Sequence, residues 1–165
     1  MENTLVGYQM YLQTLAGQPA DGDENRFLFA WTALPRTLDV MANFGMLTEL
    51  PVPSAPTLSA YGLAVQDFQP GAQPDQATAN RIAEYRAAYQ AVMNAAETEP
   101  TGIPVYKLVN NDGFLVTVAE ISAALSAYEA HPSVDIAEMP VGDPTWRYWT
   151  AFLRRAQTHG GFRTH

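Results

Sequence analysis

The sequence predicts an α+β fold: one mainly helical domain over residues 1–165 with a small antiparallel β-hairpin at about 103–118. Three observations support this prediction. A long stretch after Asp75 keeps helical spacing, two runs rich in β-branched and aromatic residues flank an Asn-Asn-Asp-Gly turn, and 47% of the residues are hydrophobic. A chain of this size and apolar content buries a sizeable core, which excludes a disordered protein.

The first segment fits two structures. Leu5, Tyr8 and Leu12 share one face of a helix that would end at Gly17, where a helix C-terminus often places glycine. Residues 6–12 also alternate between apolar and polar side chains, as a half-buried strand does. We favour the helix and keep the strand as the alternative.

The apolar run of residues 27–50 predicts two helices in succession. Asp23 or Asn25 provides a cap for the first of them. Pro35 lacks a backbone N–H, so we expect it to end or kink that helix and to stand at the first position of the second. The proline-rich residues 51–56 then form an extended connector.

The middle of the chain combines an irregular stretch with the clearest helix. Residues 57–74 are rich in turn formers, with an alternating pattern at 61–65 that fits a short strand. Asp75 is the predicted N-cap of the helix that follows. Its apolar seam repeats every three or four residues, which is typical of a helix packed on a core. The seam consists of Ile82, Tyr85, Tyr89, Val92 and Ala96.

The predicted hairpin follows this helix. Residues 103–109 and 114–118 have strand composition, and the intervening residues 110–113 end in Asp-Gly, which favours the positive φ angles of a tight turn. Thr117 and Glu120 form a capping box that opens the next helix, which we expect to stop before His131.

The last helix is predicted to begin with Asp143 as its N-cap and Pro144 in its first position, after a loop at 133–142. Tyr148 lies between two Trp residues on this helix, so the three rings cannot all face one core, and one of them belongs at the surface or at a pocket wall. Gly160 and Gly161 end the helix. Its inward face is predicted to consist of Trp146, Trp149, Phe152, Leu153 and Ala156.

The charge argues against a protein that binds nucleic acid by neutralising phosphates. Nine Lys and Arg stand against seventeen Asp and Glu, which gives a net charge of −8. The N-terminus lacks the basic start of a signal peptide, and no run approaches the roughly 18 apolar residues of a membrane span, so we expect a cytoplasmic protein without membrane contact. The preference for Arg over Lys, with abundant Ala and Pro, is typical of a GC-rich bacterial genome.

No motif in the sequence indicates an enzyme. The absence of Cys excludes thiolate metal sites, disulfides and a thiol nucleophile. The chain has no nucleophile elbow, phosphate-binding loop or EF-hand pattern. His131, His159 and His165 each follow or end a predicted helix, where a solvated His is common, and the spacing of the last two matches no established zinc-ligand pattern. We therefore predict no metal and no cofactor, and lean against catalysis.

Three functional hypotheses remain. The first is a non-enzymatic interaction module, such as an acidic inhibitor or immunity-type protein that binds a more basic protein, because the chain is acidic and rich in Trp and Tyr. The alternative is a small-molecule-binding protein, or an enzyme without a local motif, with an aromatic-lined pocket. The third is an assembly component that oligomerises through the seam of residues 82–96. The residues predicted to bind are Trp146, Trp149, Tyr148, Tyr85, Tyr89, Arg155 and His159.

Overall fold

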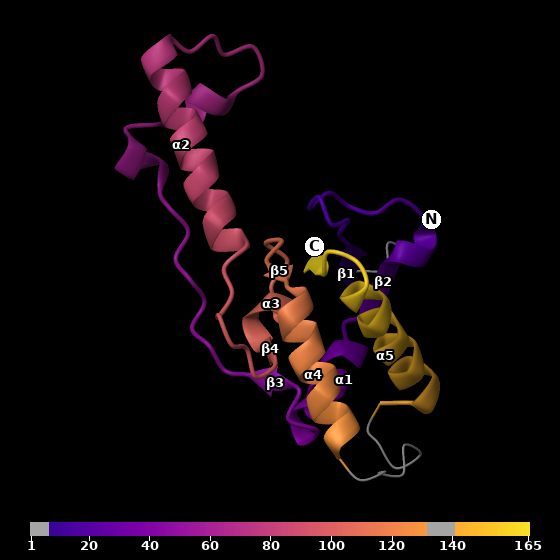
Figure 1. Cartoon of the computed structure of the whole chain (residues 1–165). Coiled ribbons are helices and arrows are strands. Elements are labelled where there is room, and N and C mark those ends of the chain that lie inside the picture. The colour runs from indigo at the N-terminus through magenta and orange to yellow at the C-terminus, as the bar shows by residue number, and fades with distance from the viewer. Residues whose placement is uncertain (1–6, 132–140) are drawn as a thin grey trace. The chain divides into compact units, whose positions relative to one another are not determined.

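A computed structural model describes residues 7–131 and 141–165, and it confirms the α+β class (Figure 1). The predictions for Leu5 and for most of the 133–142 loop lie outside these residues. The chain divides into two compact units: residues 1–51 together with 96–165, and residues 52–95. The single domain that the sequence predicts stays a prediction.

The first unit contains a four-stranded antiparallel sheet in the order β2-β1-β6-β5. Its strands are β1 (Gly7–Leu12), β2 (Arg26–Ala30), β5 (Leu115–Val116) and β6 (Phe162–Thr164). The helix favoured for the first segment is therefore wrong, and the strand alternative is confirmed for residues 7–12. Met10 and Leu12 lie on the inner face and are fully buried, whereas the intervening Tyr11 is only half-buried. This alternation is what a strand covered on one face requires.

The hairpin predicted at about 103–118 is wrong. Residues 103–104 form β4 (Ile103–Pro104), which pairs in parallel with β3 (Leu47–Thr48), and the chain then turns into the short helix α3 (Val105–Val109). β5 pairs with β6 and not with β4. The physical reason is the burial of Lys107 beside Leu108: the helical turn aims the ammonium group at a buried carboxylate, and the carbonyl of Lys107 accepts a hydrogen bond from Thr164 Oγ1.

Three longer helices belong to the same unit: α1 (Ala33–Asn43), α4 (Val118–Ala130) and α5 (Asp143–Gln157). The first of the two helices expected within 27–50 is wrong, because β2 occupies its start. Pro35 lies in the first turn of α1, where its missing N–H costs no intrahelical hydrogen bond. The capping box of Thr117 and Glu120 is confirmed, whereas the N-cap of α5 is Gly142, one residue before the predicted Asp143.

The end of α5 turns directly into β6. Gly161 has a φ of 82°, and a Cβ atom on Gly160 would lie 2.1 Å from the carbonyl oxygen of Thr14. Both positions therefore require glycine, one for its conformation and one for the close approach of the β1 end. This tight turn brings Phe162 back against the helix that precedes it.

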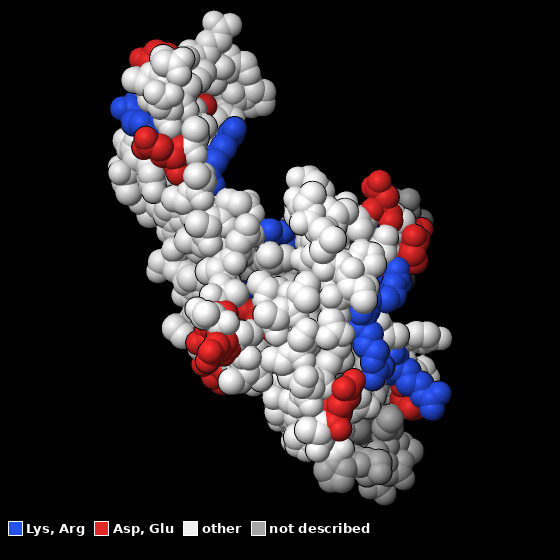
Figure 2. Space-filling view, in the orientation of Figure 1, with Lys and Arg blue, Asp and Glu red and all other residues white. Residues whose placement is uncertain are grey.

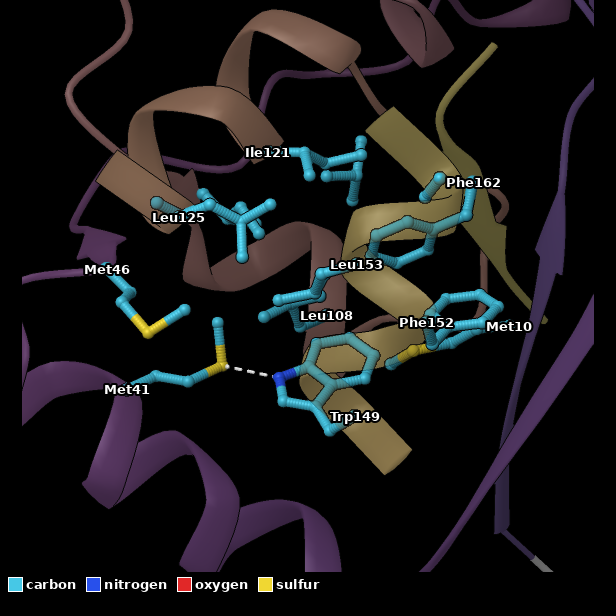
Figure 3. Packing of buried hydrophobic residues seen from close by; sticks show 14 of the residues in the cluster. Met10, Met41, Met46, Leu108, Ile121, Leu125, Trp149, Phe152, Leu153 and Phe162 are labelled. Carbon is cyan, nitrogen blue, oxygen red and sulfur yellow. Dashed lines mark hydrogen bonds between the residues drawn. The ribbon is translucent and has the colours of Figure 1, made fainter. Parts of the chain in front are cut away.

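The core of this unit lies between the sheet and α5, and Trp149 stands at its centre (Figure 3). The Trp149 ring is fully buried, and its centroid lies 5.0 Å from that of Phe29 and 5.9 Å from that of Phe162. Its Nε1 donates a hydrogen bond to Met41 Sδ on α1 at 3.3 Å (Figure 3). All five residues predicted for the inward face of α5 are buried.

The second unit is built around α2 (Gln76–Met93). Asp75 caps this helix as predicted, since its Oδ1 accepts a hydrogen bond from Thr78 N at 2.7 Å, and this bond lowers the pKa of the Asp75 carboxyl. Two short 3-10 turns, residues 58–61 and 65–68, replace the strand suggested at 61–65. Tyr85 packs on the rings of both turns, with centroids 5.7 Å from Tyr61 and 5.8 Å from Phe68.

The packing of α5 on the sheet predicts a large difference between two adjacent residues. Trp149→Ala removes the ring at the centre of the core, and we expect it to lower the free energy of unfolding by about 3–5 kcal/mol. Tyr148→Ala removes a side chain that is 70% exposed, and we expect a change within about 0.5 kcal/mol. Urea unfolding followed by circular dichroism measures both. Equal effects of the two substitutions would contradict this packing.

Candidate functional site

An open groove of about 540 Å³ lies between β2 and α5 in the first unit. Its β2 side runs from Arg26 to Ala30, and its helical side carries Thr145, Tyr148, Ala151 and Arg155. The spacing of three and four residues places these helical side chains along one flank of α5. A groove of this volume accommodates a ligand or a short stretch of a partner chain.

The local sequence explains how β2 forms one wall. Phe27 and Phe29 lie on the inner face of the strand, where both rings contact Trp149. Leu28 lies on the opposite face and is 46% exposed. The strand therefore anchors itself through two aromatic side chains and presents its backbone edge to the groove.

Within residues 7–131 and 141–165, the outer edge of β2 has backbone groups that no hydrogen bond uses. Among the described residues β2 pairs only with β1, so it is an edge strand of the sheet. Gln9 and His165 exchange both of their backbone hydrogen bonds, so the backbone groups of Gln9 point towards β6. The backbone groups of the next residue, Met10, therefore point towards β2, where they bond to its partner Phe27. It follows that the N–H and C=O groups of Leu28 point away from β1, towards the outside of the sheet.

The charges around the groove differ from the net charge of the chain. Arg26, Arg147, Arg154 and Arg155 lie on β2 and α5, and Figure 2 shows a blue band of basic side chains over α5. Two Arg and one Glu are among the described residues that line the groove. Arg26 and Arg147 are paired with Asp23 and Asp143, so Arg154 and Arg155 are the cations of this surface that form no ion pair among the described residues.

Arg155 is held in place by neutral acceptors. Its guanidinium donates to Asn25 Oδ1 at 2.7 Å and to the carbonyl oxygen of Glu24. Among the described residues neither Arg154 nor Arg155 forms an ion pair with a carboxylate, whereas Arg26 pairs with Asp23. The Arg155 guanidinium is thus oriented at the end of the groove where β2 begins, and the two acceptors that hold it there are neutral oxygens.

The structure distributes the predicted binding residues over different environments. Tyr148 and Arg155 line the groove together. Trp146 and Trp149 are 1% and 0% exposed and belong to the core, so they offer no surface to a ligand. Tyr85 and Tyr89 are half-buried in the second unit, and the Nδ1 of His159 lies 2.8 Å from the carbonyl oxygen of Arg155, at the end of α5.

Sequence reasoning missed the β2 side of the groove. The sequence predicts a helix from Phe27 onward, although the five residues from Arg26 to Ala30 are rich in aromatic and apolar side chains of strand type. Trp31 follows directly, is 52% exposed and packs against Tyr8 with ring centroids 5.1 Å apart. The signal that could have found this wall is the Phe-x-Phe alternation.

No match to a protein family, to a curated protein or to a solved structure was found. No helix in the described part of the chain has the length and apolar character that a membrane crossing needs. Residues 7–131 and 141–165 also hold no group of three or more His, Asp or Glu side chains that could bind a metal ion. The groove is therefore the feature of the molecule from which a function can be inferred.

A buried ion pair lies elsewhere in the first unit. Lys107 Nζ donates to Glu120 Oε1 and to the carbonyl oxygen of Leu115, both at 2.8 Å, and neither charged side chain is more than 1% exposed. Burial lowers the pKa of Lys107, while the hydrogen bond to Glu120 acts in the opposite direction. Glu120 Oε2 accepts the N–H of Thr117. These bonds connect α3, β5 and α4, which indicates a structural role for the pair.

The ion pair predicts a strong effect when one partner is lost. Lys107→Met leaves the Glu120 carboxylate buried without its cation, and we expect the free energy of unfolding to fall by about 3–5 kcal/mol. Adding Glu120→Gln should recover part of the loss, because the amide is neutral and its oxygen can still cap Thr117. Urea unfolding of both variants measures this. A double variant less stable than Lys107→Met would contradict the argument.

Proposed function

We propose that this chain is a non-enzymatic protein-interaction module and that the groove between β2 and α5 is its contact site. The observation that carries the proposal is the gathering of Leu28, Tyr148 and Arg155 around an open groove. Aromatic residues and Arg dominate the binding energy of protein interfaces. Tyr148 is 70% exposed, which gives the helical wall of the groove aromatic surface that a partner can bury.

Charge affects binding of a partner both at long range and at the contact itself. The net charge of −8 favours a basic protein as the partner, because it attracts opposite charge at a distance and raises the association rate. The groove has its own positive side chains, so the segment in direct contact is selected by local charge. A basic partner and a groove with positive side chains are compatible, since a protein with positive net charge can present an acidic or apolar segment.

The alternative of an aromatic pocket for a small molecule receives less support. Two of the five aromatic residues predicted to bind, Trp146 and Trp149, are packed in the core. The groove that the structure contains is open and is lined partly by strand backbone, which suits a chain segment better than a compact ligand. The interaction module is therefore the function that the geometry supports best.

Substitution of Tyr148 tests the proposal. Immobilised wild-type protein, Tyr148→Glu and Leu15→Glu are used to capture partners at low salt from the organism that makes the protein, and captured proteins are identified by mass spectrometry. Leu15 is the matched control, because it is an apolar residue that is 87% exposed and does not line the groove. We expect a partner that the wild type and Leu15→Glu retain and that Tyr148→Glu binds about 30-fold more weakly, the size of a hot-spot loss.

The same capture tests the charge of the partner. A basic partner should dissociate as the salt concentration rises, because screening weakens the long-range attraction. Retention that is equal for all three proteins would show that the groove is not the contact site. Retention that salt does not affect would remove the electrostatic part of the proposal.

A further inference from the structure

The backbone edge of β2 specifies the kind of segment that fits the groove. Leu28 directs its N–H and C=O groups outward, and the outward-facing position after it is Ala30. A partner chain that lies extended along this edge would satisfy these groups as a fifth strand of the sheet. A partner helix satisfies its own backbone groups and would leave those of Leu28 without a protein partner.

The side chains of an added strand that point towards α5 would contact the flank of that helix. On an added strand every second side chain faces the helix-covered side of the sheet, where Phe27, Tyr148, Ala151 and Phe152 line the groove. These surfaces are apolar and aromatic. The segment therefore carries apolar residues at alternate positions.

The end of the groove next to Arg155 selects for charge. Asn25 and Glu24 hold the Arg155 guanidinium at the start of β2, and both contacts use neutral oxygens. Arg154 lies beside it on α5 and is exposed. A carboxylate on the segment would form charge-assisted hydrogen bonds with this end of the groove, whereas Lys or Arg would be repelled.

We propose that the groove binds an extended, apolar and acidic segment of a partner protein by adding it as a strand to the edge of β2. This inference rests on the proposed function and adds the conformation and the charge of the bound segment. A second copy of this chain is a less suitable occupant. Pairing of β2 with β2 of a second copy would bring two Arg-bearing α5 flanks to one groove, where like charges oppose association.

A displayed library of random twelve-residue peptides, selected on the full chain, provides the probes. We expect the recovered peptides to be richer in Asp and Glu than in Lys and Arg and to have apolar residues at alternate positions. The best peptide is synthesised, labelled and titrated by fluorescence anisotropy. Arg155→Gln should weaken its binding by about tenfold or more, the size of one lost charge-assisted hydrogen bond.

Backbone methylation of the peptide tests strand addition without altering the protein. A methyl group on an amide nitrogen that faces β2 removes a ladder hydrogen bond, whereas the next amide along faces away. We expect a scan of single N-methyl peptides to alternate, with losses of about tenfold or more at every second position. Loss at every position, at none, or at intervals of three and four would overturn strand addition.

Variants of the edge provide the matching test on the protein. Leu28→Pro removes the outward N–H and keeps the ladder of Phe27 and Phe29, since proline is tolerated on an edge strand. Leu28→Ala is the control that keeps the N–H and loses the side chain. We expect Leu28→Pro to bind the peptide at least about tenfold more weakly than Leu28→Ala. If Leu28→Pro fails to fold by circular dichroism, the methylation scan decides.

The outcomes separate this inference from the proposed function. Peptides that Tyr148→Glu no longer binds, but that tolerate methylation at every position, would leave the groove as a contact site and refute strand addition. Selection of basic peptides, or a stable dimer of the chain that excludes peptides, would overturn the proposed occupant. Recovery of no peptide, or of peptides that bind Tyr148→Glu as well as the wild type, would count against both.

Discussion

The packing of Trp149 between the sheet and α1 is the contact on which the rest of the first unit depends. Its ring contacts Phe27 and Phe29 on β2 and Phe162 on β6, and its Nε1 reaches Met41 on α1. One side chain thus links α5 to strands at both ends of the chain. Because β1 and β6 are also paired directly, the N-terminal and C-terminal segments fold as parts of one sheet.

The groove is a consequence of the same packing. Trp149 and Phe152 direct one face of α5 into the core, which leaves Tyr148 and Arg155 on the flank that adjoins the edge of β2. A sheet edge is ordinarily protected by charge, by a short strand or by a covering element. Here the strand is short and α5 lies alongside, but the outward amide of Leu28 has no hydrogen-bond partner in the described part of the chain. The helix α5, fixed by its packed core face, thus lies beside the outer backbone edge of β2.

Sequence patterns predicted the helices that begin after Asp75 and Thr117, although the cap predicted at Asp23 or Asn25 precedes a strand. Asp75 and the pair of Thr117 and Glu120 cap as expected, because these signals act within one turn of the backbone. The strands were harder, because their partners are distant in the sequence: β1 pairs with β6, and the segment of Lys107 is helical because of an ion pair with Glu120. The composition of one helix predicts Tyr148 and Arg155 as binding residues, and both line the groove. Leu28 was missed because an exposed edge depends on the order of the strands.

Amide hydrogen exchange at Leu28 tests the central claim most directly. The amides of Phe27 and Phe29 donate to β1, so we predict slow exchange for both, while the outward amide of Leu28 exchanges fast in the free protein. Addition of an acidic peptide that binds the groove should slow exchange at Leu28 and leave the other two unchanged. Protection of Leu28 in the free protein, or fast exchange that persists with peptide bound, would contradict the account of an open edge that a partner strand completes.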